Sequence, residues 1–441
     1  MFSSPLSTTQ ALHVLALLPT LAASALNITL PAPELVALGG GVVGGLYRPA
    51  IQSERASLAL FLMHSGSDYL RWTPCTELAS RGYAIFCANN FASKAGQGSD
   101  LDFDLMMQNV GLGMSYLRNQ TEINHIVLLG HSGGGAMMAA YQNIAENGLS
   151  ACNGAEKISP CSDNLVGMQP ADGLVLLDAN YGTSTMTLLS VNPAVEDETM
   201  GASINESLDL FNPANGFSET GANYSVAFAK DFQSGVAARW QRLLKYAQER
   251  REIIAAGNGT FSNDEPFHIP DANFLGGNNK LFAQDTKFLS HTVRQWPLLH
   301  KNGSSTTQIV RSVRVPANLE SHTNSFQQGA LKTTINRFLR TFAIRVSEDF
   351  GFTADSFTGI DWTSSHLATQ SSVSGIRVPI LTMEDDVMTK ISFETVKILA
   401  EDGATNGPDD AQLYVPASAC KCQFTYWSKP PPSGCDWGAF G

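Results

Sequence analysis

The sequence has little charge and, in particular, few basic residues. Charged residues make up 15% of the 441-residue chain, whereas roughly 25% is typical of soluble domains. The 28 Lys and Arg residues are outnumbered by 40 Asp and Glu residues, which gives a net charge of −12. Nucleic-acid binders need a basic surface over the phosphates, so the sequence predicts no nucleic-acid partner. With 43% hydrophobic residues, the chain is instead typical of a folded protein with a large core.

The sequence also lacks the common signatures of bound cofactors. It contains no P-loop, and the run Gly39-Gly40-Gly41 lies on an expected hairpin with no helix after it, which excludes a dinucleotide fingerprint. No cysteine pair has zinc-type spacing backed by a second pair. We therefore expect no metal, nucleotide or organic cofactor, and a small molecule as the partner. Beyond the N-terminal segment, no apolar run is long enough to span a bilayer, and nothing in the sequence indicates an oligomeric state.

The N-terminal segment is apolar and ends in small residues. Residues Ala11 to Ala25 read ALHVLALLPTLAASA, and Ala23-Ser24-Ala25 matches the small-x-small pattern of signal-peptide cleavage. We expect a secreted protein whose mature chain begins at Leu26. Six N-x-S/T sequons agree with a secretory route and predict a glycoprotein: Asn27, Asn119, Asn205, Asn223, Asn258 and Asn302.

The seven cysteines suit an oxidising compartment, in which disulfides form. Cys152 and Cys161 would close a polar loop, and Cys75 with Cys87 is the next candidate pair. The remaining three lie near the C-terminus: Cys420, Cys422 and Cys435. One of the seven must be left over, and the sequence does not decide which.

Short apolar runs alternate with segments of helical length along the chain. Asp104–Arg118 is one such segment, with Leu105, Met106, Val110 and Leu112 spaced to form one apolar face. Near-continuous apolar strands are expected when helices cover both faces of a parallel sheet. The sequence therefore predicts an α/β fold with a doubly wound, mostly parallel sheet. The expected strands are Leu58–Met63, Tyr83–Ala88, Ile126–Leu129, Leu174–Leu177, Ile380–Met383 and Ala411–Val415.

This alternation is interrupted between about Tyr181 and Ile376. The stretch is rich in Asn, Gly, Ser and Thr, and it contains one strong helix from Tyr224 to about Ala256, with Arg239, Arg242, Lys245 and Glu249 on a charged face. The alternative is a separate C-terminal domain. It is less well supported, because only one pair of expected strands follows the interruption. We expect a signal peptide (1–25), the first part of the core (26–180), a cap or insertion (181–376), and the last core strands with a cysteine-containing tail (377–441).

The residues that carry chemistry lie between an apolar strand and an apolar helix. Gly130-His131-Ser132-Gly133-Gly134 matches G-x-S-x-G in the strand–turn–helix context that this motif requires. Such a turn exposes the serine hydroxyl above the sheet edge, and glycine is needed where a side chain would collide with neighbouring backbone. The N–H of Gly133 is placed to stabilise an oxyanion.

With these motifs the sequence resembles the α/β-hydrolase family, and most closely secreted or fungal-type members with a GHSGGG elbow. The likeness covers most of the mature chain and includes Gly82-Tyr83-Ala84, Cys87-Ala88-Asn89 and the strand from Ala171 to Ala179. It implies an α/β-hydrolase-type sheet with a large inserted cap. It further implies that the loop His64-Ser65-Gly66-Ser67 supplies the second oxyanion donor, and we select the N–H of Ser65. The same resemblance places His64 on the oxyanion side, so we do not expect it to be the catalytic base.

The resemblance also places the triad acid after the strand that follows the cap. Met383 is followed there by Glu384, Asp385 and Asp386, and the usual spacing favours Asp386. The same acidic run would also suit a solvated turn. Triad partners in this fold occur in the order Ser, acid, His, yet no histidine follows Asp386. Alignment by eye instead puts Cys420 where the imidazole is expected, and a neutral thiol is a poor proton acceptor.

Three explanations of the absent base remain open. A histidine from the cap region could reach the serine, and the candidates are His291, His300, His322 and His366. The C-terminal sequence could come from an altered gene model. The protein could also have kept the pocket and lost hydrolysis.

The sequence thus predicts a secreted serine esterase or lactonase that acts on a small apolar ester or lactone, with Ser132 as the nucleophile and Asp386 as the acid. The alternative is a hydrolytically inactive protein of this fold that binds a ligand or cyclises a natural product.

Overall fold

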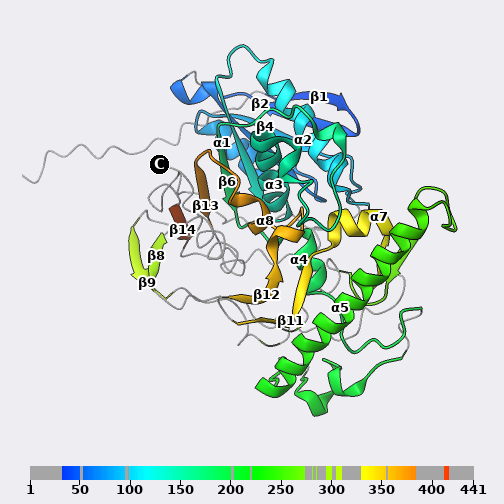
Figure 1. Ribbon diagram of the computed structural model, residues 1–441. Helices are drawn as coiled ribbons and strands as arrows, with labels where there is room; N and C mark the ends of the chain where they lie inside the picture. Colours follow the sequence, from blue (N-terminus) through cyan, green and yellow to red (C-terminus); the bar gives the residue numbers. More distant parts are fainter. Residues whose placement is uncertain are drawn as a thin grey trace, which may run out of the picture.

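A ten-stranded, mostly parallel sheet forms the centre of the molecule (Figure 1). The computed structural model describes residues 32–49, 53–94, 98, 100–199, 203–218, 221–273, 281, 285, 295–299, 304–309, 329–353, 356–383 and 412–416. The signal peptide expected at residues 1–25 lies outside them. In spatial order the strands are β1 (Glu34–Gly39), β2 (Val42–Tyr47), β4 (Ala84–Asn89), β3 (Leu58–His64), β5 (His125–His131), β6 (Gly173–Leu177), β13 (Ile380–Met383), β14 (Gln412–Pro416), β8 (Trp296–Leu299) and β9 (Ser305–Gln308).

The expected fold class is confirmed, and all six expected strands are present. Strands β4, β3, β5, β6, β13, β14 and β8 run parallel, whereas β1, β2 and β9 are antiparallel to their neighbours. The glycines Gly39, Gly40 and Gly41 connect β1 to β2 with φ between 56° and 83°, a conformation in which a side chain is strained.

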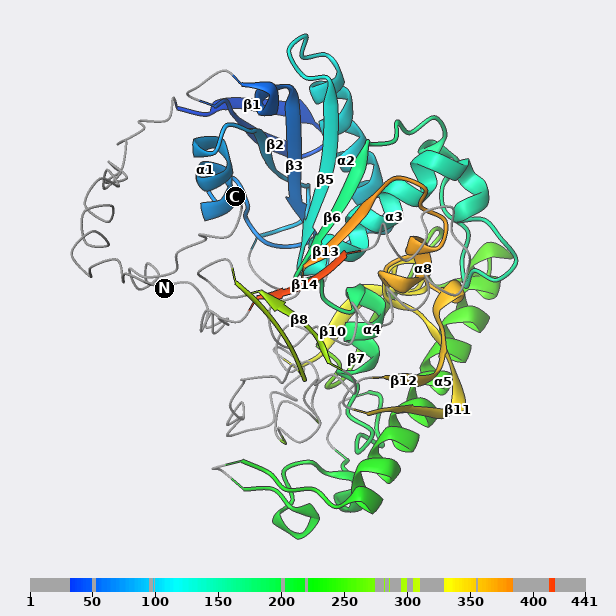
Figure 2. The same cartoon turned by 90° about the vertical axis from the view of Figure 1, so that its left-hand side faces the viewer.

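Helices cover both faces of the sheet (Figure 2). Helix α1 (Thr73–Ser80) packs on one face through Cys75, Leu78 and Ala79. The other face is covered by α2 (Phe103–Arg118) and α3 (Gly133–Asn147), which contribute to the larger core. Because the strands are covered on both faces, their residues are apolar almost throughout; every residue of β4 is buried.

The buried face of α2 differs from the expected one. Leu105 is 41% exposed and Leu112 is only partly buried, whereas Met106 and Val110 are fully buried as expected. The apolar face instead runs through residues spaced by three, four or seven: Phe103, Met106, Met107, Val110, Met114 and Leu117. Methionine fills this face as readily as leucine, because its unbranched side chain adapts to irregular gaps.

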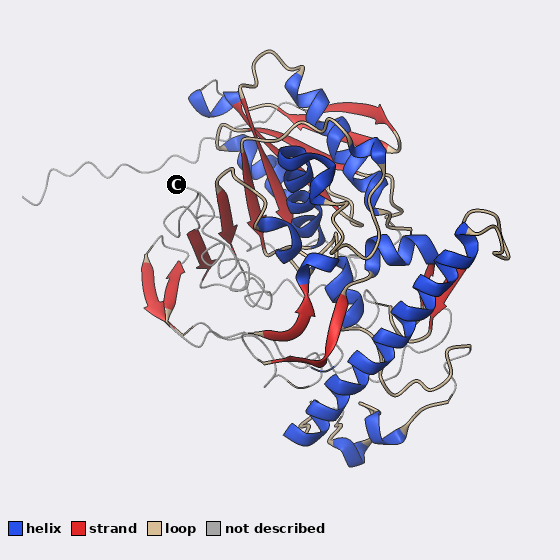
Figure 3. Ribbon diagram, in the orientation of Figure 1, coloured by secondary structure: helices blue, strands red, loops and turns tan. Residues whose placement is uncertain are grey.

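About two hundred residues separate β6 from β13, which are neighbours in the sheet. They include α4 (Gly182–Leu188), the long helix α5 (Val226–Ala255), α7 (Ile335–Arg337), α8 (Gln370–Val373) and the strand pairs β7 (Pro266–Ile269) with β10 (Leu331–Thr334) and β11 (Arg345–Phe352) with β12 (Phe357–Asp361). Figures 2 and 3 show most of these elements beyond the end of the sheet toward which β3, β5 and β6 point. Two strands of this range, β8 and β9, instead extend the central sheet beside β14.

Helix α5 confirms the expected helix and corrects one of its faces. Arg239 is fully buried and does not belong to the charged outer face: its guanidinium binds both carboxylate oxygens of Glu198, at 2.8 and 2.7 Å, and the carbonyl oxygens of Asn192 and Pro270. Arg242, Lys245 and Glu249 are exposed, as expected. A buried guanidinium is tolerated because its donors are paired in this way. Among the described residues, no helix is long and apolar enough to cross a membrane.

Candidate active site

Ser132 occupies the sharp turn between β5 and α3, half-buried at the carboxyl edge of the sheet. Its φ is 50° and its ψ −123°, a conformation that an L side chain rarely adopts. The N–H of Ser132 donates to the carbonyl oxygens of Leu177 and Asp178, at 3.2 and 3.1 Å, and its own carbonyl oxygen accepts from Asn180 and Gly135. The strained conformation is thus held from two sides, by the end of β6 and by the start of α3.

The glycines of the motif are required by close backbone approaches. A β-carbon on Gly130 would lie 2.6 Å from the carbonyl oxygen of Gly134, and one on Gly134 would lie 2.6 Å from the carbonyl oxygen of Met63. Backbone atoms cannot move aside as the end of a side chain can. The spacing that the sequence shows as G-x-S-x-G therefore reflects the packing of α3 against β3 and β5.

The expected oxyanion loop lies against the elbow. Ser65 follows β3 and is 6% exposed, and a β-carbon on Gly133 would lie 2.5 Å from its Oγ. The side-chain amide of Asn90, which follows β4, donates to the carbonyl oxygens of Ser65 and His64 at 2.8 and 3.2 Å. Asn90 thereby fixes the loop beside Gly133, whose N–H is the other expected donor to the oxyanion. The structure thus places Ser65 beside Gly133, the residue that directly follows Ser132.

Four aromatic rings pack beside the elbow, a feature that the sequence analysis missed. The ring pairs are His64–Tyr69 (5.0 Å between centroids), Tyr69–Trp72 (4.6 Å), Tyr69–His131 (5.9 Å) and Trp72–His131 (4.6 Å). A hydrogen bond joins the Tyr69 hydroxyl to Nδ1 of His131. In the sequence, three of these rings occur in the run HSGSDYLRW, which begins at the last residue of β3. Aromatic residues in a loop more often serve packing alone, so this run did not predict a functional cluster. We call these residues the ring cluster.

Both histidines of the ring cluster are neutral. Burial, together with the nearby His131 and Lys94, lowers the pKa of His64 to about 3. Burial likewise lowers the pKa of His131 to about 4. Burial raises the pKa of Tyr69 well above its ordinary value, and the charge of Asp178 adds to this effect. The cluster therefore carries no net charge beside the serine at neutral pH.

The register of the sheet aligns the ends of the functional strands. His131 of β5 is paired with Leu177 of β6, and Leu177 with Met383 of β13. The residues that follow these three therefore leave the same edge of the sheet, which is where an acid after β13 would be needed. Asp386 itself lies outside the described residues, as does Cys420. Asp178, which no sequence motif marks as functional, follows Leu177 with φ 42° and also lies at this edge.

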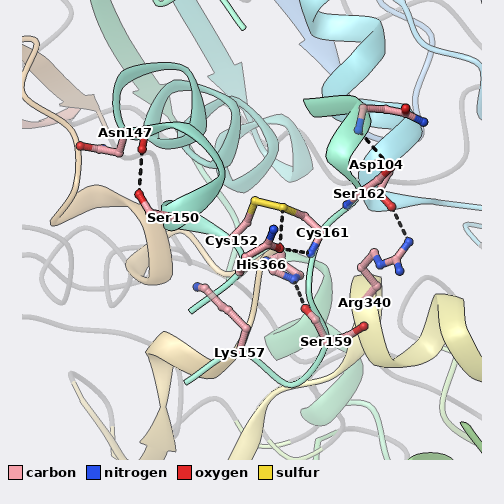
Figure 4. Close-up of a disulfide and its surroundings, with 12 residues drawn as sticks. Asp104, Asn147, Ser150, Cys152, Lys157, Ser159, Cys161, Ser162, Arg340 and His366 are labelled. Carbon is pink, nitrogen blue, oxygen red and sulfur yellow. Dashed lines mark hydrogen bonds and ion pairs between the residues drawn. A yellow bond between two sulfur atoms is a disulfide. The ribbon is translucent and has the colours of Figure 1, made fainter. Parts of the chain in front are cut away.

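His366, the one of the four candidate bases that lies among the described residues, is not placed as the base. It is 4% exposed, and its Nε2 hydrogen-bonds the carbonyl oxygen of Ser159 at 2.7 Å (Figure 4). Its ring stacks on that of Phe103, with 4.5 Å between the centroids. Since a carbonyl oxygen only accepts, Nε2 carries the proton and offers no lone pair. Burial lowers the pKa of His366 to about 3, helped by the charge of Lys157. His291, His300 and His322 lie outside the described residues.

The structure forms disulfides between Cys75 and Cys87 and between Cys152 and Cys161. The first joins α1 to β4, and the second closes the loop whose Ser159 binds His366 (Figure 4). Among the expected sequons, Asn119, Asn223 and Asn258 are exposed. Asn205 is half-buried, and its side chain accepts hydrogen bonds from Ser207. Asn27 and Asn302 lie outside the described residues. The described residues contain no group of three or more metal-ligating side chains.

A polar cavity of about 190 Å³ lies away from the elbow, where the start of α2 meets the segment after β10. None of the residues that line it belongs to the elbow. The lining residues are Asp102, Asp264, Thr334, Asn336, Arg337 and Arg340. Arg337 approaches Asp102 at 3.6 Å, and Arg340 pairs with Asp104. These pairs join α2 to the insertion, so we assign the cavity no role at Ser132.

The order β1-β2-β4-β3-β5-β6-β13-β14, with a strained serine between the fifth strand and its helix, defines an α/β-hydrolase architecture. No family model matches the chain, and no curated protein matches it.

Several solved structures are similar. The siderophore hydrolase EstB from Aspergillus fumigatus matches 87% of this chain and 89% of its own length, with 13% identity and a TM-score of 0.37. Est1E from Butyrivibrio proteoclasticus matches 38% of this chain with 13% identity and a TM-score of 0.24. An inhibited esterase B from Lactobacillus rhamnosis matches 36% with 18% identity and a TM-score of 0.26. This chain spans 56% and 51% of the lengths of the last two. Because these identities and TM-scores are low, the assignment of the architecture is based on the order of the strands and on the elbow, not on these similarities.

Proposed function

We propose that the protein is a serine hydrolase that cleaves an ester or lactone of a small apolar molecule. The observation that carries the proposal is the conformation of Ser132, which is held at positive φ directly before Gly133, the residue that lies against Ser65. Strained backbone of this kind costs about 1–3 kcal/mol and is found mainly where function requires it. A serine with only a structural role would need neither the strain nor the crowded glycines around it.

In the proposed reaction, Ser132 attacks the substrate carbonyl and forms an acyl-enzyme, which water then hydrolyses. The N–H groups of Gly133 and Ser65 would hold the oxyanion. Asp386 would orient the general base, which accepts the serine proton and returns it to the leaving alcohol. Neither Ser159-bound His366 nor any metal has a part in this scheme.

The ring cluster supports an apolar substrate. Trp72 is half-buried, so part of its surface remains accessible beside the elbow, and its ring packs at a tilt against that of His131, the residue directly before the nucleophile. Aromatic faces and neutral imidazoles contribute apolar contact area without a charge. A small apolar acyl or alcohol group would therefore be favoured over a charged one.

A fluorophosphonate probe tests the proposal directly. We expect rapid stoichiometric modification of Ser132, located by peptide mass spectrometry, and no modification in Ser132→Ala. The matched control is Ser150→Ala, which removes an exposed hydroxyl near the far end of α3 and should label as the wild type does. An unlabelled wild type with intact fold would contradict the proposal and favour an inactive ligand-binding protein.

We also propose that the protein is secreted and glycosylated. The proposal is supported by the two disulfides and by the exposure of Asn119, Asn223 and Asn258. Non-reducing peptide maps of protein from the culture medium should show Cys152 joined to Cys161, and glycosidase treatment should convert these asparagines to aspartates. Protein that stays inside the cell with free thiols would contradict it.

A further inference from the structure

The imidazole of His64 is held at one nitrogen by the backbone of its own loop. The N–H groups of Gly66 and Ser67 both donate to Nδ1, at 3.0 and 2.8 Å. A nitrogen that accepts two N–H groups carries no proton, so these bonds assign the ring proton to Nε2. The loop after β3 thus fixes both the orientation and the tautomer of the ring.

The protonated nitrogen faces the elbow. A β-carbon on Gly133 would lie 3.3 Å from Nε2 of His64 and 2.5 Å from Oγ of Ser65. Gly133 directly follows the nucleophile and begins α3. Within the described part of the chain, no group accepts a hydrogen bond from Nε2, so this donor is left for a group that enters the site.

His64 remains a neutral donor over the ordinary pH range. The titratable groups that face it are His131 from β5, Lys94 from the loop after β4, and Tyr69, whose ring stacks on it. Burial, with smaller contributions from the neighbouring His131 and Lys94, lowers the pKa of His64 to about 3. A general base needs a lone pair directed at the serine hydroxyl, but the lone pair of His64 is bound by Gly66 and Ser67. His64 can therefore donate at this site but cannot act as the base.

We propose that Nε2–H of His64 is a third hydrogen-bond donor to the oxyanion, beside the N–H groups of Gly133 and Ser65. This rests on the proposed function of Ser132. When Oγ of Ser132 bonds to the carbonyl carbon, the π electron pair moves to the oxygen, and the serine proton passes to the general base. The charge on oxygen is lost again when the bond to the leaving alcohol breaks and that alcohol takes the proton. His64 gains and loses no proton in either step.

Two substitutions separate the two nitrogens of His64. In His64→Asn, the side-chain oxygen occupies the place of Nδ1 and can still accept from Gly66 and Ser67, but the Nε2–H donor is gone. In His64→Gln, the amide nitrogen reaches the place of Nε2, but the acceptor that anchors the loop is lost. Removal of one oxyanion donor typically costs about 10²–10³ in kcat. We expect a loss of this size in His64→Asn with KM changed by less than about threefold, and a smaller loss in His64→Gln.

The opposite order, with His64→Asn active and His64→Gln impaired, would show that His64 only anchors the loop and would overturn the proposal. Thermal unfolding of both variants establishes that they are folded. The loss in His64→Asn should also be the same from pH 5 to pH 9, because a neutral donor does not titrate there.

Nitrogen NMR of the labelled wild-type protein gives a test without turnover. We expect a proton on Nε2 of His64 and no titration between pH 5 and pH 8. A proton on Nδ1, or titration near neutral pH, would overturn the inference while leaving the role of Ser132 intact. If the wild type neither reacts with the fluorophosphonate nor hydrolyses esters, the proposed function fails and this inference fails with it.

Discussion

The N–H of Ser132 donates to the carbonyl oxygen of Asp178 at 3.1 Å, and both residues have positive φ, at 50° and 42°. The ends of two neighbouring parallel strands, β5 and β6, are thus joined by a hydrogen bond between two strained residues. Such conformations persist only where the surroundings determine them. The position of the nucleophile therefore depends on β6 as well as on its own turn.

The crowding at Gly134 predicts that even one methyl group is not tolerated there. In Gly134→Ala the new carbon would lie 2.6 Å from the carbonyl oxygen of Met63, so the start of α3 must shift. We expect a decrease of about 1–3 kcal/mol in the free energy of unfolding, measured in urea, and loss of fluorophosphonate labelling. The matched control is Gly111→Ala in α2, where the nearest atom is 3.8 Å away. It should be neutral or stabilising by up to about 1 kcal/mol, and equal effects in both variants would contradict the explanation.

The acid is tested by a pair of substitutions. If a histidine serves as the base, we expect Asp386→Asn to reduce kcat about 10⁴-fold, because an amide cannot hold the imidazole in the required tautomer. Asp178→Asn should reduce it less than about tenfold, since the backbone carbonyl that holds Ser132 is kept. Ester hydrolysis with a saturating p-nitrophenyl substrate gives both values. The reverse pattern would assign the acid to Asp178.

The missing base is tested at Cys420. If this residue occupies the histidine position of the fold, Cys420→His should increase hydrolysis of short p-nitrophenyl esters at least about a hundredfold, since loss of a triad member costs about 10⁴-fold. The increase should disappear in the Ser132→Ala background. Cys420→Ser is the control, because it breaks any disulfide of Cys420 without supplying a base. A fast wild type that Cys420→His leaves unchanged would direct the search to His291, His300 and His322.

Acid should destabilise the protein through its buried histidines. The unfolded chain binds a proton on histidine near pH 6.5, but folded His366 does not until its pKa of about 3. Stability from the neutral ring is therefore complete above pH 6.5 and lost as the pH falls toward 3, at up to about 1.4 kcal/mol per pH unit.

The matched variant is His366→Gln, whose amide can still donate to Ser159 but does not titrate. Its free energy of unfolding should fall less steeply than that of the wild type between pH 7 and pH 4. His125→Gln, at the exposed start of β5, should follow the wild type. Parallel curves for the wild type and His366→Gln would show that His366 does not contribute.

The sequence alone determined the local elements of this protein. Each parallel strand of the core is a short apolar run, and burial on both faces imposes that pattern regardless of the neighbouring strand. The sequence also predicted the elbow. Gly130 and Gly134 lie so close to neighbouring backbone that no side chain fits, so glycine is required at both positions. Contacts within one strand–turn–helix unit thus leave a local signature.

The tertiary structure decided which polar and aromatic side chains meet. Nothing local to Arg239 indicates that Glu198, 41 residues away in sequence, neutralises it, and nothing local to His366 indicates that Ser159, 207 residues away, binds its proton. The same holds for the ring cluster, in which Tyr69 from the loop after β3 meets His131 at the end of β5. A histidine has the same residue identity whether it is a base, a donor or a packed ring. Its role is determined by which of its nitrogens is bound and by how far water is excluded, and the folded chain sets both.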